Sequence, residues 1–248
     1  MSRGTTLYTG IVLYSTLDPE ASAMLVEDEL ITWIGAEDSA QALHPDAEQI
    51  DATGCLVTPG FVDAASTADG SAPDPGETVH AAASGIVMRL PGPTGMRDGV
   101  HVLAPLSESA PYRTLTASGV PLALGSAGVD EHRDPWAWVR AVSEQGPAQE
   151  RLSARAAYLA ATRGGLRLAG VWHPGSLQTA LPATFVIWEP WDLTVRGTGS
   201  ERDTWSADPR ARTPLLPDLS AGTPRALRTV SHGEILHDML DKVTGDDG

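Results

Sequence analysis

Cysteine and lysine are almost missing from this chain of 248 residues, which contains only Cys55 and Lys242. A single cysteine excludes an intrachain disulfide and a metal cluster built on cysteines. It also makes a reducing compartment, the cytoplasm, the simplest setting. Cys55 follows Gly54 inside an apolar run, which is typical of a small buried side chain rather than a nucleophile.

Long apolar runs are missing too. No stretch approaches the ~18 apolar residues that a membrane-spanning helix needs. Near the N-terminus, Thr5, Thr6 and Thr9 interrupt the apolar residues, and no signal-peptide cleavage site follows. We therefore expect a cytoplasmic protein without direct membrane insertion, while attachment to a membrane-bound partner stays open.

Basic residues are few: 17 Lys and Arg stand against 32 Asp and Glu, which gives a net charge of −15. Such a chain repels nucleic acid and anionic lipid at long range. It also has no basic patch with interleaved aromatic residues, so we expect no nucleic-acid partner. The charge is that of a soluble protein.

What is present favours short β-strands at both ends of the chain. Turn-forming residues (25 glycines and 19 prolines) are spread along the sequence. Residues rich in β-branched and aromatic types predict strands. The predicted strands are 7–14, 23–26, 30–35, 49–52, 185–188, 226–230 and 234–236. This spacing indicates a sandwich or a small barrel-like sheet.

The middle of the chain mixes strands and helices. Predicted strands cover 58–64, 85–90, 100–104 and 120–125, and short helices cover 39–43 and 112–118. Asp134 followed by Pro135 predicts a helix start, and Ser153 predicts another, with the second helix ending at Gly164-Gly165. Residues 196–225 read as a loop, and the acidic tail 241–248 as disordered.

One segment carries a family resemblance: Val57-Thr58-Pro59-Gly60-Phe61-Val62-Asp63-Ala64. It resembles the first barrel strand of the metal-dependent amidohydrolase superfamily, in particular of the imidazolonepropionase and formamide-deformylase type. Further matches occur in the family's order and cover about half of the chain. They are residues 7–10, 23–35, 118–126, 134–136, 153–157, 175–177 and 182–188.

The resemblance implies a composite fold of the α/β plus β class. Both chain ends, residues 1–57 and 176–240, would build a small β-sandwich, and residues 58–175 would build the (β/α) barrel. A complete barrel typically takes ~250 residues. The sequence therefore predicts a truncated, incomplete barrel remnant.

The chemistry that the resemblance implies is missing from the matching positions. The family's His-x-His pair falls on Ala65 and Thr67, and its late aspartate falls on Ala127. Neither a methyl group nor a short neutral hydroxyl replaces an imidazole ligand of zinc or iron. The family's bridging lysine has no candidate, because Lys242 lies in the tail. We therefore expect no catalytic residues and no metal cofactor.

Other constellations are weak. The seven histidines show no His-x-His or His-x3-His spacing. Leu124 stands where a serine-hydrolase elbow around Ser126 needs glycine. If a vestigial pocket persists, its candidate residues are Asp63, Ser66, Thr67, Ser126, Asp130 and His132.

These observations favour a non-catalytic, amidohydrolase-like pseudoenzyme that acts as a protein-binding, scaffold or regulatory subunit. A truncated barrel exposes surfaces that need cover, so we expect a protein partner or a homo-oligomer. Two alternatives remain. One is a small-molecule sensor that uses the vestigial pocket, and the other is a metal-dependent hydrolase of C–N bonds with non-standard ligands.

Overall fold

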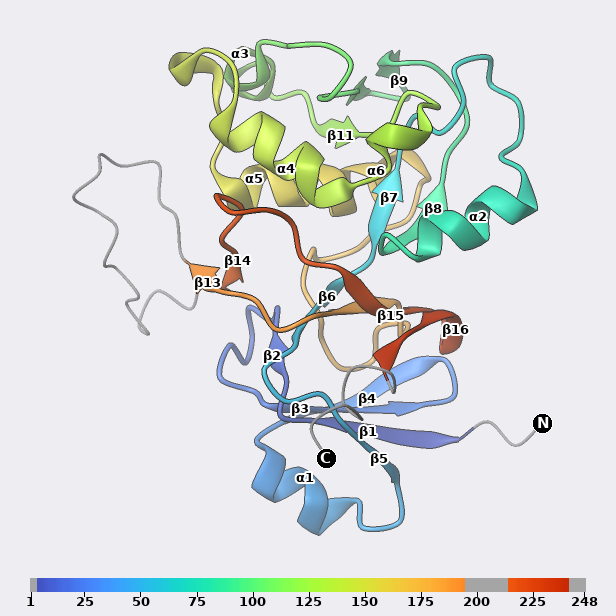
Figure 1. Ribbon diagram of the computed structural model, residues 1–248, viewed down its shortest axis with the longest axis vertical. Helices are drawn as coiled ribbons and strands as arrows, with labels where there is room; N and C mark the ends of the chain where they lie inside the picture. The colour runs from blue at the N-terminus through green and yellow to red at the C-terminus, as the bar shows by residue number, and fades with distance from the viewer. Residues whose placement is uncertain (1–3, 195–213, 241–248) are drawn as a thin grey trace.

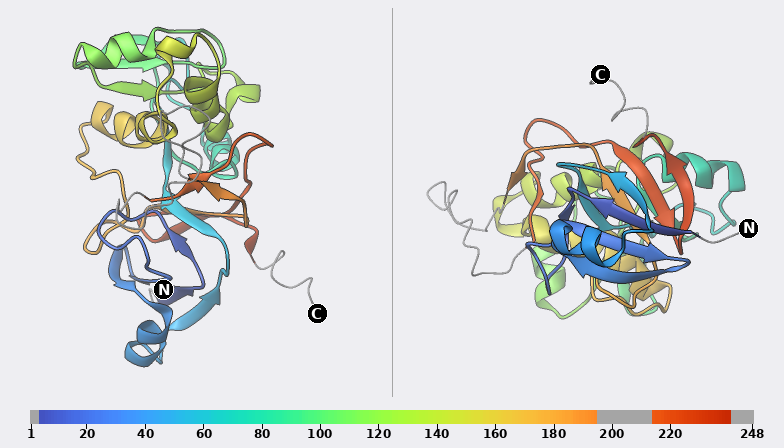
Figure 2. Two further views of the ribbon diagram at one scale, coloured as in Figure 1. Left: turned by 90° about the vertical axis from the view of Figure 1, so that its left-hand side faces the viewer. Right: turned by 90° about the horizontal axis from the view of Figure 1, so that it is seen from below.

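A computed structural model describes residues 4–194 and 214–240 of the chain, and shows two stacked parts (Figures 1 and 2). The chain passes from the lower part to the upper part through β6 (Leu56–Pro59) and β7 (Phe61–Asp63), with only Gly60 between them. The predicted tail 241–248 and residues 196–213 of the predicted loop lie outside the described residues.

The first sheet has the strand order β4-β3-β1-β5. Its strands are β1 (Thr5–Thr9), β3 (Ala23–Glu27), β4 (Leu30–Gly35) and β5 (Glu48–Asp51), and helix α1 (Glu37–Leu43) lies below it (Figure 1). The prediction of one strand over 7–14 is wrong. Gly10 adopts a φ of 69° and ends β1, so that β2 (Val12–Leu13) joins another sheet.

The second sheet brings both chain ends together in the order β16-β15-β12-β6-β2. Its C-terminal strands are β12 (Phe185–Trp188), β15 (Ala226–Ser231) and β16 (Glu234–Asp238). One apolar cluster joins the two sheets, because it contains Tyr8 and Ile31 of the first sheet and Phe185 and Ile187 of the second. The ring of Tyr8 meets the edge of Phe185 at 5.4 Å between centroids.

The upper part contains two parallel strand pairs. They are β7 with β8 (Ile86–Arg89), and β10 (Val100–Leu103) with β11 (Leu122–Leu124). The Ala64 N–H donates to the Leu124 carbonyl oxygen at 3.0 Å and links the pairs. β9 (Gly95–Arg97) pairs with β10 at the edge, so the upper part has two sheets, β8-β7 and β11-β10-β9. Within the described residues these strands form no closed barrel.

Helices cover the upper sheets. They are α2 (Pro75–Ala82), α3 (Tyr112–Ala117), α4 (Pro135–Glu144), and a continuous helix made of α5 (Ala154–Leu159), a π-turn (Ala160–Gly164) and α6 (Gly165–Leu168). The predicted end at Gly164-Gly165 is wrong. The helix continues through both glycines. Glycine is needed at these two positions because the helix lies close to the strands there: a Cβ at Gly164 would overlap the Leu122 carbonyl oxygen, and one at Gly165 would overlap Val62.

Buried aromatic rings fill the junction of the two parts. Phe61 stands edge-on to Trp136, Tyr158 and Trp188 at centroid distances of 4.9, 5.5 and 5.8 Å. The rings come from β7, α4, α5 and β12, so they tie both parts together. Two shorter strands, β13 (Leu193–Thr194) and β14 (Leu216–Pro217), pair beside them.

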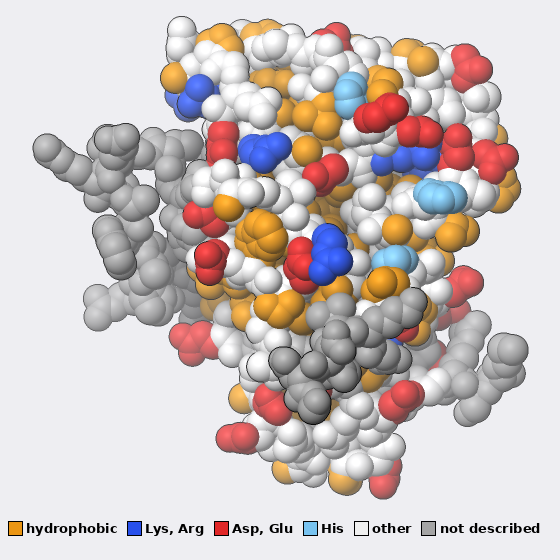
Figure 3. All heavy atoms as spheres, in the orientation of Figure 1, with side chains coloured by type: hydrophobic (Ala, Val, Ile, Leu, Met, Phe, Trp, Pro, Cys, Tyr) orange, Lys and Arg blue, Asp and Glu red, His pale blue; other side chains and the backbone are white. Residues whose placement is uncertain are grey.

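The surface follows the composition. Figure 3 shows acidic side chains spread over one face of the molecule with few basic ones among them. In the part of the chain that the structure describes, no helix has the length and apolar character of a membrane span.

Candidate functional site

The predicted site lies where β7 and β11 end side by side. Asp63, the last residue of β7, is fully buried, and its Oδ2 accepts a hydrogen bond from the Ser126 hydroxyl at 2.6 Å. Its Oδ1 accepts from the Ser126 N–H at 3.0 Å and from the Ala65 N–H at 3.2 Å. Both carboxylate oxygens therefore have partners from the protein itself.

The residues that follow Asp63 continue this closed arrangement. Ala65 is fully buried and Ser66 is 1% exposed, and the Ser66 hydroxyl donates to the Leu90 carbonyl oxygen at 3.0 Å. Thr67 is half-buried, and its hydroxyl donates to the Ser71 carbonyl oxygen at 2.8 Å. Each side-chain hydroxyl here holds the backbone of a neighbouring loop segment.

Two arginines that the sequence analysis did not single out donate hydrogen bonds to the backbone of these loops. Arg97 on β9 donates to the Ala64 carbonyl oxygen at 2.7 Å and to the Pro91 carbonyl oxygen at 2.5 Å. Arg89 at the end of β8 donates to the Ser66 carbonyl oxygen at 3.4 Å. The sequence carried a signal for Arg89, which lies at the end of the predicted strand 85–90, but none for Arg97, which lies outside every predicted strand.

Arg89 also belongs to an ion-pair network. Its side chain is 2% exposed and meets Glu77 of α2 at 3.0 Å. Arg133 meets the same Glu77 oxygen at 3.2 Å and Asp130 at 2.7 Å. The network joins α2 to the loop after β11.

Asp130 and His132, the remaining predicted residues, have other partners. Asp130 pairs with Arg133, and the Nδ1 atom of His132 lies 3.1 Å from the Ser107 hydroxyl. The His132 carbonyl oxygen accepts from the Trp138 indole N–H at 2.6 Å. Of the six predicted residues, the structure thus joins Asp63 to Ser126 directly, and Thr67, Asp130 and His132 each bond elsewhere.

The residues at this place do not fit zinc or iron. Ala65 and Ala127 offer no donor atom, and Ala127 is backbone-strained, with a φ of 57°. Across the described residues, no group of three or more His, Cys, Asp or Glu side chains lies in a metal-binding arrangement. The described residues at this place therefore do not supply the ligand set that a metal-activated water needs.

Comparison with known proteins was informative only for structure. No protein-family model matches the sequence, and no curated protein does. Among solved structures, an enamidase described as a new member of the amidohydrolase superfamily aligns with a TM-score of 0.52 and 13% identity, covering 94% of this chain and 96% of its own. An amidohydrolase from a Sargasso Sea environmental sample gives a TM-score of 0.58 and 13% identity, with coverages of 95% and 93%.

The fold is similar to that of these solved amidohydrolases. A third neighbour with this fold, the atrazine chlorohydrolase of Arthrobacter aurescens TC1 in complex with zinc, has a TM-score of 0.57 and 14% identity, with coverages of 95% and 96%. Identities this low carry the fold and not the chemistry. The predicted resemblance to amidohydrolases is thus confirmed for the fold.

Proposed function

We propose that this chain is a shortened, non-catalytic relative of the imidazolonepropionase type that works as a protein-binding scaffold or regulatory subunit. The observation that carries the proposal is the environment of Asp63. Two backbone N–H groups and one hydroxyl bond its oxygens. A carboxylate used in this way fixes two strand ends, and its complete burial separates it from a substrate or a metal.

The strand order supports a barrel remnant. In a closed eight-stranded barrel the first and last strands are neighbours. Here β7 and β11 are neighbours through the bond from Ala64 to Leu124, while β8 and β10 flank them. A barrel that keeps its first two and its last two β/α units, and loses the units between them, would have these neighbours. The division at residues 57 and 176 belongs to the same proposal, as does a cytoplasmic setting, which the single buried thiol of Cys55 favours.

The burial of the predicted site residues favours the binding proposal over the sensor and the hydrolase. Asp63, Ser66 and Ser126 are each at most 1% exposed, so a sensor built on these residues would have to break their bonds to admit a ligand. A hydrolase with non-standard ligands would need donors brought in from elsewhere. Binding of a partner at the protein surface requires neither broken hydrogen bonds nor additional ligands.

An exposed apolar surface supports binding. Trp172 and Val171, on the loop after α6, are 75% and 45% exposed. Their loop is held to the loop that carries Leu17, itself 69% exposed, by a 3.1 Å hydrogen bond between the Thr16 and Ser176 hydroxyls. Single exposed apolar residues are ordinary, but adjacent ones that include a tryptophan are typical of an interface.

Metal content tests the non-catalytic half of the proposal. We expect purified protein dialysed against zinc or iron to keep far less than one ion per chain by elemental analysis. One tightly bound ion per chain would overturn the proposal. The metal content of the native chain is compared with that of an Ala65→His, Thr67→His variant, which carries two imidazoles at the positions that match the family's His-x-His pair.

Co-purification from the native cell tests the binding half. We expect a partner, or a second copy, in constant stoichiometry through two chromatographic steps, with the mass from light scattering distinguishing the two. Trp172→Glu should release it. Leu43→Glu is the matched control, because Leu43 is 62% exposed on α1, in the opposite part of the molecule. A monomer without partner, or equal loss in both variants, contradicts binding through this surface.

A further inference from the structure

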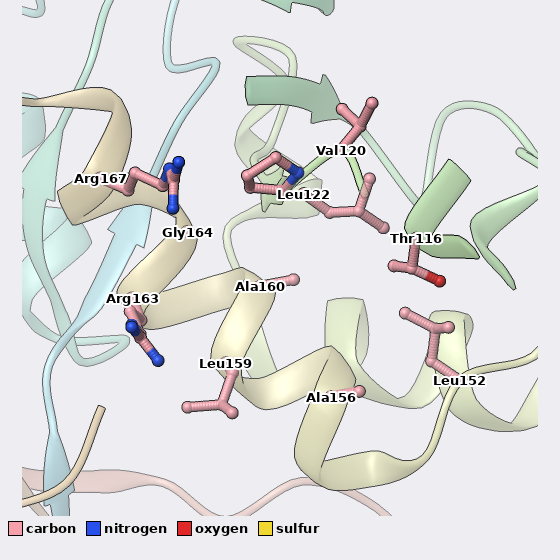
Figure 4. A pocket seen from close by; sticks show the side chains of 11 residues that line it. Thr116, Val120, Leu122, Leu152, Ala156, Leu159, Ala160, Arg163, Gly164 and Arg167 are labelled. Atoms are coloured by element: carbon pink, nitrogen blue, oxygen red, sulfur yellow. The ribbon is translucent and has the colours of Figure 1, made fainter. Parts of the chain in front are cut away.

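An apolar groove lies at the end of β11 opposite to Ser126. It has a volume of about 350 Å³. Its floor is the start of β11 and the residues before it, and its walls are α3 and the continuous helix α5 to α6 (Figure 4). Most of the side chains that line it are apolar. They include Val120, Leu122, Leu152, Ala156, Leu159 and Ala160.

Two arginines stand on one side of the groove. Arg163 and Arg167 lie one helical turn apart, so their side chains share a helix face, and both line the groove (Figure 4). Both are exposed, and neither forms an ion pair with a carboxylate of the described residues. In a chain of net charge −15, two adjacent cations that no described carboxylate pairs with give this groove a local positive field.

The wall that carries Arg163 has an unusual backbone. The π-turn Ala160–Gly164 inserts a residue into the helix at the groove, and such turns are rare and concentrate at functional sites. Gly164 then lies against the Leu122 carbonyl oxygen, where a Cβ would not fit. The turn thereby sets the small side chain of Ala160 beside the cavity while Arg163 stays at its edge.

We propose that this groove binds a small amphipathic carboxylate, with its apolar chain against Leu122, Leu152 and Leu159 and its head group between Arg163 and Arg167. Guanidinium groups pair with carboxylates through parallel N–H···O bonds. The volume is near the lower end of ligand pockets, which favours a short chain. The site would work whether or not the chain is catalytic, since it shares no residue with Asp63 and its partners.

Isothermal titration with three matched probes tests the proposal: octanoate, octan-1-ol and octylammonium. We expect octanoate to bind about tenfold more tightly than the alcohol, and the cation not to bind. Equal affinity for octanoate and octylammonium, or no octanoate binding at millimolar concentration, would overturn it.

Variants locate the site. The double variant Arg163→Gln, Arg167→Gln should reduce octanoate affinity to that of octan-1-ol, and Ala156→Phe should block both by filling the groove. Arg225→Gln is the control, because the Arg225 side chain is 73% exposed just before β15, away from the groove, and pairs with Glu189. Melting temperatures confirm that each variant folds. Unchanged octanoate affinity in the double variant, or equal loss in Arg225→Gln, would place the binding elsewhere and reject the proposal.

Discussion

The carboxylate of Asp63 and the hydroxyl of Ser126 are 63 positions apart in sequence and form a buried hydrogen bond of 2.6 Å. The bond fastens the end of β7 to the residues that follow β11, and so joins the two sheets of the upper part. Around it, Asp63 also fixes the backbone of Ala65 and Ser126. Asp63 thus accepts three hydrogen bonds from the protein itself.

Ser126→Ala should therefore destabilise the protein by about 1.5–3 kcal/mol, because it leaves a buried carboxylate oxygen without its donor. Ser66→Ala is the matched control. Its hydroxyl is as buried but bonds a neutral carbonyl oxygen, so the expected loss is about 1 kcal/mol. Urea unfolding measures both. A loss in Ser126→Ala no larger than in Ser66→Ala would show that Asp63 is not held as described.

Helix starts show what the sequence could and could not predict. Asp134 before Pro135 predicts a cap, and the structure confirms it, since the carboxylate accepts from the Trp136 and Ala137 N–H groups. The same pair, Asp74 before Pro75, begins α2, yet no helix was predicted there. The two helices differ in the residues they bury: α4 places tryptophans in the core, whereas α2 is short and buries only alanines.

Long-range contacts limited the prediction of the site. The motif around Asp63 identified the fold, and Ser126 was singled out, but no local pattern shows that their side chains meet. Arg97 illustrates the same limit. Its partners, the carbonyl oxygens of Ala64 and Pro91, are backbone atoms that every sequence contains, so only the fold reveals them.

Gly164 offers a test of the close contact between helix and sheet. Gly164→Ala should cost about 1–3 kcal/mol, although alanine normally favours a helix, because the added Cβ would overlap the Leu122 carbonyl oxygen. Gly76→Ala in the first turn of α2 is the control, where the nearest atom is a side-chain oxygen of Asp74 at 3.1 Å. Thermal unfolding should show no loss there. Equal effects in both variants would contradict the contact.

Cys55 should be inert in the folded protein. It is 2% exposed, and burial, with smaller contributions from Asp51 and Glu189, raises the pKa of its thiol to about 11. The thiolate is the reactive form, and at pH 8 such a thiol is ionised to about one part in a thousand. Ellman's reagent should therefore react only after unfolding in guanidinium chloride. Prompt reaction of the native protein would contradict the burial.

His173 should make the stability depend on pH. Its Nδ1 accepts the Gly175 N–H at 3.0 Å, and burial first, then the nearby charge of Arg163, lowers the pKa of its imidazole below 6.5. The unfolded chain therefore binds a proton before the folded chain does as the pH falls. The stability from the neutral ring is present above about pH 6.5 and is lost as the pH falls toward the folded pKa.

Two measurements check this expectation for His173. In NMR titration, its ring should titrate below pH 6.5, and Arg163→Gln should move that titration upward by removing the neighbouring charge. In urea unfolding at pH 7.5 and 5, His173→Asn should lose less stability between the two values than the wild-type chain, because asparagine still accepts the Gly175 N–H and does not titrate. If the titration of His173 is unchanged in Arg163→Gln, the charge of Arg163 does not act on His173. The expected electrostatic link between this loop and the groove would then be refuted.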